Sequence, residues 1–347
     1  MTSPAISCLI PVFNAERFLP AAMDSVLGQT FADFEVVVVD DGSTDRSAEI
    51  IADYARRDPR VKLFSKPNGG IVSALNFGLQ HCRGDHVARM DADDIALPDR
   101  FFVQMATFAQ HPDAVAVGGL IQSIDENGNP ISAPGSPSRV TQTRLDCFPP
   151  VVANVQHSAG TFRRSALVAV GGYRRTFPHA EDYDLYLRLA AYGRFYNPPT
   201  LVLWYRVHGG SLSMVNLQTQ ERSAVLAELS AQARAAGLPD PGDAEQPLGL
   251  AEYNQRLGDR LCPVATIERY IEFRLWRRLS GARAASEPEY RARVLRGLFD
   301  RASYRTRADR QLNRRIVLSM GRKLVRRATT ASRQLLGPRP PSVGLAR

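Results

Sequence analysis

Short apolar runs alternate with helical patterns over the first hundred residues. Four short runs predict strands over residues 6–12, 34–39, 61–64 and 85–90, and the first of these strands is expected to be buried. Between them, residues 15–27 and the segments through Ile50–Ala55 and Ala74–Leu79 carry apolar positions at helical spacing. Pro98 is placed to open a further helix. This alternating order predicts an α/β fold whose mainly parallel sheet carries helices on both faces.

The pattern changes further along the chain. Residues 114–130 predict one more strand and a turn, and residues 181–192 predict a helix that begins with acidic residues. A short helix is expected after Arg164. From about Leu217 onward the sequence becomes mainly helical and rich in Arg and Ala. The chain is therefore expected to form an α/β domain over residues 1–215 and a helical, Arg-rich region over residues 216–347.

Composition and charge narrow the class of protein. Of 347 residues, 44% are hydrophobic and 23% are charged, which is typical of a globular chain. Four widely spaced cysteines favour a reducing compartment over a disulfide framework. Neither a signal sequence nor an apolar run of about 18 residues is evident, so a cytoplasmic protein is expected. The net charge of +9 is concentrated in residues 301–347, where twelve Arg and one Lys face a single acid.

Polar side chains follow each predicted strand at its carboxyl end. Asn14 follows the first strand, Asp40 and Asp41 the second, Asn68 the third, and the segment 91–93 the fourth. In open parallel sheets, ligands bind beyond the carboxyl ends of the strands. The sequence therefore predicts a binding site at this edge.

Two of these clusters have a specific chemistry. Asp91 and Asp93, separated by Ala92, offer hard oxygen ligands to Mg²⁺ or Mn²⁺ bound with a diphosphate, although a solvated acidic turn has the same sequence. An acid in Asp40-Asp41 can accept hydrogen bonds from a ribose or a base. The alternative for this second cluster is a strand-to-helix turn with capping side chains.

Two further candidates lie later in the chain. Glu181 and Asp182 could supply a general base, or could simply complement the dipole at a helix N-terminus. His208 lies in a Gly-rich loop and is either a metal ligand or a surface histidine, and Arg206 beside it could neutralise a phosphate.

Several motifs together resemble glycosyltransferase family 2, and the resemblance extends from about residue 5 to residue 215. The motifs that carry it are Ile6–Asn14, Val39–Asp45, Met90–Asp94, Glu181–Leu185 and Tyr205–Ser211. The resemblance implies a GT-A fold over residues 1–215 and an inverting reaction that uses a nucleotide-sugar donor, with UDP favoured. It also implies a Mn²⁺ or Mg²⁺ cofactor.

The same resemblance implies roles for individual residues. Asp93 is similar to the main metal ligand, with Asp91 and His208 beside it. Asp182 is similar to the catalytic base, with Glu181 as its rival. The residues expected to contact the nucleotide-sugar are Pro11, Val12, Phe13, Asn14, Asp40, Asp41, Asn68, Asp91 and Ala92.

The basic segment of residues 301–347 suggests a binding partner, and two alternative functions are open to the α/β domain. Within residues 301–347, apolar residues at helical spacing are interleaved with arginines, which predicts a basic amphipathic helix. One interpretation places this helix on an anionic membrane surface near a lipid-linked glycan acceptor. A helix packed on the main domain is the alternative, and no nucleic-acid-binding motif is evident. The rival functions are a sugar-nucleotide nucleotidyltransferase and a non-catalytic nucleotide-sugar-binding protein. A nucleotidyltransferase would carry a Gly-rich basic loop after the first strand, and this chain lacks one there. The acids at 91, 93 and 182 argue against a non-catalytic binding protein.

Overall fold

A computed structural model gives the fold of most of the first 244 residues. It describes residues 3–146, 149–209, 217–244, 252–253, 267–268, 270–271 and 274. The chain divides into two compact units, and the unit formed by residues 1–146 and 150–261 contains every element named below. Among the described residues, no helix is both long and apolar enough to cross a bilayer. The expected basic helix in residues 301–347 lies outside the described residues.

Strands and helices alternate along the first unit as the sequence predicts. The strands are β1 (Ile6–Val12), β2 (Phe34–Asp40), β3 (Val61–Ser65), β4 (His86–Arg89), β5 (Ile95–Ala96), β6 (Ala114–Val117), β7 (Leu120–Ile124), β8 (Thr161–Arg163), β9 (Arg194–Tyr196) and β10 (Leu201–Arg206). The α-helices are α1 (Leu19–Leu27), α2 (Ser47–Arg57), α3 (Ile71–His81), α4 (Arg100–Gln110), α5 (Arg164–Ala169), α6 (Glu181–Leu189) and α8 (Leu217–Ala235). Two short 3₁₀ turns, η1 (His157–Ala159) and η2 (Pro241–Asp243), complete the set.

Seven strands form the main sheet in the order β3-β2-β1-β4-β8-β6-β9. The first four strands of this order are parallel, and β8 runs antiparallel to both of its neighbours. A second sheet has the order β5-β10-β7. The predicted mainly parallel α/β architecture is therefore confirmed, with an antiparallel strand and a small second sheet added to it.

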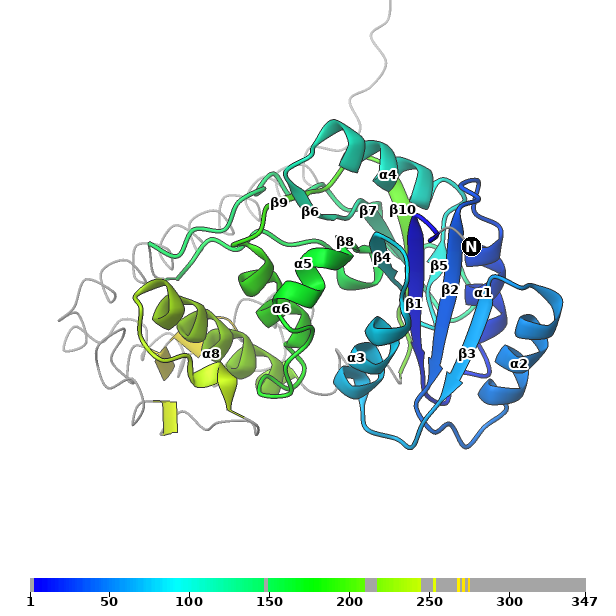
Figure 1. Cartoon of the computed structure of the whole chain (residues 1–347), viewed down its shortest axis with the longest axis horizontal. Coiled ribbons are helices and arrows are strands. Elements are labelled where there is room, and N and C mark those ends of the chain that lie inside the picture. The colour runs from blue at the N-terminus through cyan, green and yellow to red at the C-terminus, as the bar shows by residue number, and fades with distance from the viewer. Residues whose placement is uncertain are drawn as a thin grey trace, which may run out of the picture. The chain divides into compact units, whose positions relative to one another are not determined.

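Every residue of β1 and β2 is buried, and alternate residues of these strands point to opposite faces of the sheet, so both faces are covered there. Ile10 and Val38 pack in a core with α1, α2 and Phe101 of α4. Leu9 and Val37 pack in a second core with α3, α5 and α6. Figure 1 shows α2 and α3 on opposite sides of β1–β3. Continuous apolar runs are what a strand buried on both faces requires.

Two predicted elements differ from the structure. The expected helix over residues 15–27 begins only at Leu19, because Asn14 has a φ of 50° and a turn precedes the helix. The single strand expected within residues 114–130 is two strands, β6 and β7, which belong to different sheets. The apolar run continues through Gly118 and Gly119, so its pattern does not reveal the change of sheet.

Candidate active site

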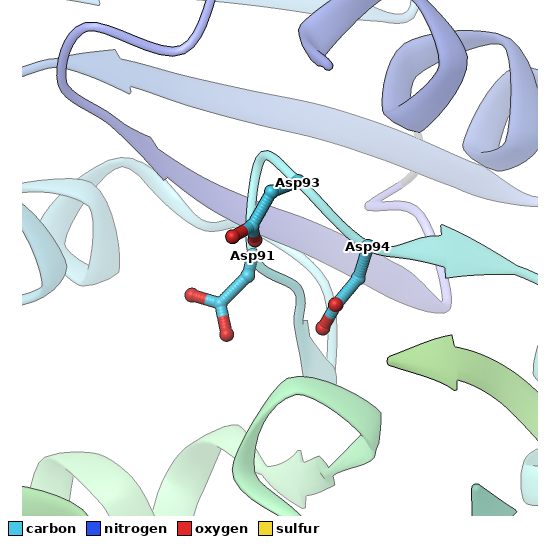
Figure 2. Close-up of side chains that lie close together, drawn as sticks. All are labelled: Asp91, Asp93 and Asp94. Atoms are coloured by element: carbon cyan, nitrogen blue, oxygen red, sulfur yellow. The ribbon is translucent and has the colours of Figure 1, made fainter. Parts of the chain in front are cut away.

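Three aspartates in the loop after β4 bring their carboxylates together. One oxygen from each of Asp91, Asp93 and Asp94 lies within 4.8 Å of the other two. Figure 2 shows the three side chains leaving one short loop and turning toward the same region. The loop starts at the carboxyl end of β4, the middle strand of the main sheet, which pairs with β1. Oxygen ligands at this spacing suit a hard divalent cation.

His208 meets this acidic loop from a distant part of the chain. Its Nε2 lies 2.9 Å from Oδ2 of Asp93, and its ring packs on Phe18 with 5.1 Å between ring centroids. Burial and the charge of Asp91 raise the pKa of Asp93. Asp91, Asp93 and His208, three of the candidates from the sequence, therefore lie together, and the negative charges of the two carboxylates repel each other.

The structure gives Asp94 and Arg206 a bracing role that the sequence does not reveal. Asp94 is 1% exposed, and its Oδ1 accepts the backbone N–H of Arg206 at 2.8 Å. The Arg206 guanidinium donates to the carbonyl oxygen of Asp93 at 2.8 Å and to those of Asp125 and Glu126 at 3.1 and 3.0 Å. Arg206, a candidate for phosphate neutralisation, is thus buried and engaged by main-chain oxygens. It ties the loop that leads to His208 to the acidic loop.

A buried arginine beneath the acidic loop is a second feature that the sequence did not indicate. The guanidinium of Arg89 forms an ion pair with Asp91, and the Arg89 side chain is only 6% exposed. Its backbone N–H donates to the carbonyl oxygen of Gly160, which fixes the residue at the end of β4. A buried charge is tolerated when it is paired, and Asp91 is the partner that compensates the charge of Arg89.

Glu181 and Asp182 occupy the first turn of α6. Burial raises the pKa of both carboxyls, and the neighbouring charge of Asp182 helps to bring that of Glu181 to about 7. The charge of Asp91 also raises both pKa values and that of Arg89 lowers both, so these four groups lie within electrostatic range of one another. Oδ1 of Asp182 accepts the backbone N–H of Tyr183 at 2.7 Å, which favours the ionised form of Asp182.

The end of β1 carries an exposed aromatic residue and a strained turn. Pro11 and Val12 are the last residues of β1, and Phe13 directly after them is 51% exposed. Asn14 adopts the left-handed conformation, and its Oδ1 accepts the backbone N–H of Thr44 at 2.8 Å. This contact holds the loop after β1 against the loop after β2.

The two acids after β2 are buried, and both bind main-chain groups. Asp40 accepts the backbone N–H of Ser43 at 3.1 Å, a contact within the turn that leads from β2 to α2. Asp41 accepts the backbone N–H groups of Gly69 and Gly70, at 3.1 and 2.8 Å, and pairs with Lys66. Asp41 therefore joins the loops after β2 and β3. The neighbouring Asn68 is exposed at this edge, whereas Ala92 of the acidic loop is buried.

Comparison with solved structures supports the class that the fold and the acidic edge define. The crystal structure of S. aureus TarS 1-349 in complex with UDP-GlcNAc aligns with a TM-score of 0.55 and 20% identity, covering 84% of this chain and 90% of that one. At this identity the likeness concerns the fold. The mainly parallel sheet, with the acidic loop at the carboxyl end of β4, therefore has a GT-A-type fold.

Sequence comparison then identifies the family. The family model described as Glycosyl transferase family 2 matches residues 7–171. An uncharacterized glycosyltransferase of Haemophilus influenzae is 31% identical over 263 residues, which cover 74% of this chain and 92% of that protein. Chondroitin synthase of Pasteurella multocida is 29% identical over 220 residues, but the match covers 63% of this chain and only 22% of that enzyme. The chain belongs to glycosyltransferase family 2.

Proposed function

We propose that the protein is an inverting glycosyltransferase that moves a sugar from a nucleoside diphosphate onto a hydroxyl group. The observation that carries the proposal is the approach of two acidic groups from different elements. Asp91 and Asp93 come from the loop after β4, and Asp182 comes from the start of α6, yet the charge of Asp91 influences the pKa of Asp182. The proposed reaction needs a cation that binds the diphosphate and a proton acceptor, both beside the same sugar. Acidic groups that approach from two different elements can supply both.

Asp91, Asp93 and His208 are the residues that would hold Mn²⁺ or Mg²⁺. Two carboxylates and an imidazole suit these cations. The raised pKa of Asp93, caused by burial and by Asp91, marks an excess of negative charge that a cation would offset. When bound, the cation would neutralise the negative charge that develops on the departing diphosphate.

Asp182 accepts the proton of the acceptor hydroxyl. The hydroxyl oxygen forms a bond to the anomeric carbon while the bond to the diphosphate oxygen breaks, so the configuration inverts in one displacement. Two observations favour Asp182 over Glu181 as the base. The backbone N–H of Tyr183 donates to the Asp182 carboxylate at 2.7 Å and supports its ionised form, whereas Oε2 of Glu181 is buried with no hydrogen-bond partner among the described residues.

The nucleotide occupies the carboxyl edge beside β1 and β2. The exposed ring of Phe13 is available to stack on the base, and the loops fixed by Asp40 and Asp41 line the same edge. Pro11, Val12, Asn14, Asn68 and Ala92 complete the expected contacts. UDP is favoured because of the family relationship, whereas the buried Asp41 shapes this edge through its contacts with Gly69 and Gly70.

The acceptor is a hydroxyl of a glycan or lipid-linked precursor in the synthesis of a cell-surface polysaccharide. The likeness to chondroitin synthase supports a polysaccharide product. Residues 301–347, with twelve Arg and one Lys, would hold a cytoplasmic enzyme at an anionic membrane surface, where a lipid-linked acceptor lies. Flotation of the full chain and of a chain lacking residues 301–347 with anionic liposomes tests this part, and equal flotation would contradict it.

The test of the reaction is product release from a panel of nucleotide-sugars, with and without Mn²⁺. We expect nucleoside diphosphate from one donor when metal is present, and its loss in Asp182→Asn. A nucleotidyltransferase would instead release pyrophosphate from a nucleoside triphosphate and a sugar phosphate. A protein that binds a nucleotide-sugar without releasing nucleoside diphosphate would refute the transferase assignment.

A further inference from the structure

A buried aspartate one half-turn after Asp182 links α6 to two arginines. The Asp184 side chain has no exposed surface, and its Oδ2 accepts Nε of Arg174 at 3.1 Å and Nε of Arg188 at 2.9 Å. The second Arg174 contact, from Nη2 to Oδ1, completes a two-pronged ion pair. Such fork-shaped pairs fix orientation as well as distance. The turn of α6 that carries Asp182 is therefore anchored on its buried side.

Arg174 also reaches the segment that follows α8. Its Nη1 donates to Oδ2 of Asp240 at 2.8 Å, and the Asp240 side chain is only 4% exposed. Asp240 in turn pairs with Arg234 of α8 and accepts the backbone N–H of Gly242 at 2.8 Å, and it also contacts the hydroxyl of Ser230. A continuous chain of buried charges thus runs from α6 through Arg174 to α8 and η2.

A second set of contacts joins the same elements. The hydroxyl of Tyr183 donates to Oε1 of Glu228 in α8 at 2.7 Å. The hydroxyl of Thr176 donates to the carbonyl oxygen of Gly242 at 2.9 Å. The residue next to Asp182 is therefore bonded directly to α8. Both α6 and α8 lie beyond residue 171, where the match to the family model ends.

We propose that Arg174 and Asp240 are positioning residues that hold the start of α6, and so Asp182, in register with the acidic loop. This inference rests on the proposed function. On this account α8 and η2 belong to the catalytic unit, although neither supplies a group that touches the substrate. Removing one partner of a buried ion pair leaves an uncompensated charge, so loss of the Asp240 charge leaves Arg174 paired with Asp184 but detached from η2 and α8, and the start of α6 loses that support. A misplacement of about 1 Å in a reacting group can lower a rate by about 10²-fold.

The chain offers a matched pair of variants for the test. Asp240 and Asp243 both pair with Nη1 of Arg174, at 2.8 and 3.0 Å, but the Asp243 side chain is 75% exposed. Exposed ion pairs contribute little, so Asp243→Asn should behave as the wild type. We expect Asp240→Asn to lower kcat by about 10- to 100-fold while the donor KM and the affinity for nucleoside diphosphate stay at the wild-type values.

The readouts are kcat, donor KM and nucleoside diphosphate affinity by calorimetry, each with the full chain. A fall in donor affinity that accounts for the whole loss of activity would show a general structural role and overturn the proposal. Equal kcat for the wild type, Asp240→Asn and Asp243→Asn would overturn it as well. If Asp240→Asn fails to fold, Ser230→Ala and Arg174→Lys replace it, and the same split between kcat and KM decides. A wild type that releases no nucleoside diphosphate refutes the proposed function itself, which these variants do not test.

Discussion

The buried position of the Glu181 carboxyl leads to a prediction about how the free energy of unfolding changes with pH. The prediction does not depend on the proposed reaction. Glu181 lies in the first turn of α6, and its Oε2 is buried with no hydrogen-bond partner among the described residues. Glu181→Gln keeps the shape of the side chain and removes its ability to ionise. The comparison of wild type and variant therefore isolates the cost of a buried negative charge beside Asp182.

The size of the effect follows from the pKa of Glu181. Burial and the charge of Asp182 raise it from 4.5 to about 7 in the folded protein. Because the folded state binds the proton more tightly, stability is lost as pH rises from the unfolded pKa through the folded one. At about 1.4 kcal/mol per pH unit, the whole interval corresponds to about 3 kcal/mol, of which about 2 kcal/mol falls between pH 5.5 and pH 8.5.

The assay is urea unfolding of wild type, Glu181→Gln and a control, at both pH values and without nucleotide or metal. Relative to wild type, Glu181→Gln should gain about 2 kcal/mol of unfolding free energy between pH 5.5 and pH 8.5. Glu49→Gln is the control, because the Glu49 side chain is 75% exposed. Parallel pH profiles for wild type and Glu181→Gln would refute the reasoning, since they would mean that Glu181 ionises freely in the folded protein.

Three further predictions concern the reaction. Asp182→Asn should lower kcat by about 10²–10⁴ with unchanged donor affinity, since it removes only the proton acceptor; steady-state kinetics and calorimetry separate the two quantities. Asp93→Ala should weaken Mn²⁺ binding measured by calorimetry, whereas Asp113→Ala, at a residue whose side chain is 52% exposed, should not. Chelation with EDTA should abolish nucleoside diphosphate release and added Mn²⁺ should restore it; full activity in EDTA would contradict the metal assignment.

Much of the fold could be predicted because its signals are local. The strands β1 and β2 are short, mostly apolar runs, and each of β1–β4 is followed by polar residues that the parallel topology brings to one edge. The same pattern predicts Asp91 and Asp93 as candidates, whereas Asp182 follows from an acidic cluster at a helix start and from the family resemblance. Local periodicity could not separate β6 from β7, because both are apolar and only their partners differ.

The supporting residues could not be predicted, because their contacts are long-range. Asp94 and Arg206 are 112 residues apart, and Arg174 and Asp240 are 66 apart. The sequence around Arg89 does not tell whether its side chain is buried or exposed, and only the fold shows that it is buried against Asp91. Sequence motifs thus indicate groups with candidate chemistry, whereas the groups that orient them emerge from tertiary structure.

The most direct test of single displacement is a crystal structure of the protein with Mn²⁺ and an intact donor analogue. The account predicts Mn²⁺ against Asp93 and His208, with the Asp182 carboxylate facing the anomeric carbon from the side opposite the diphosphate. A nucleotide bound away from the loop after β4, or an Asp182 carboxylate on the same side as the diphosphate, would contradict it.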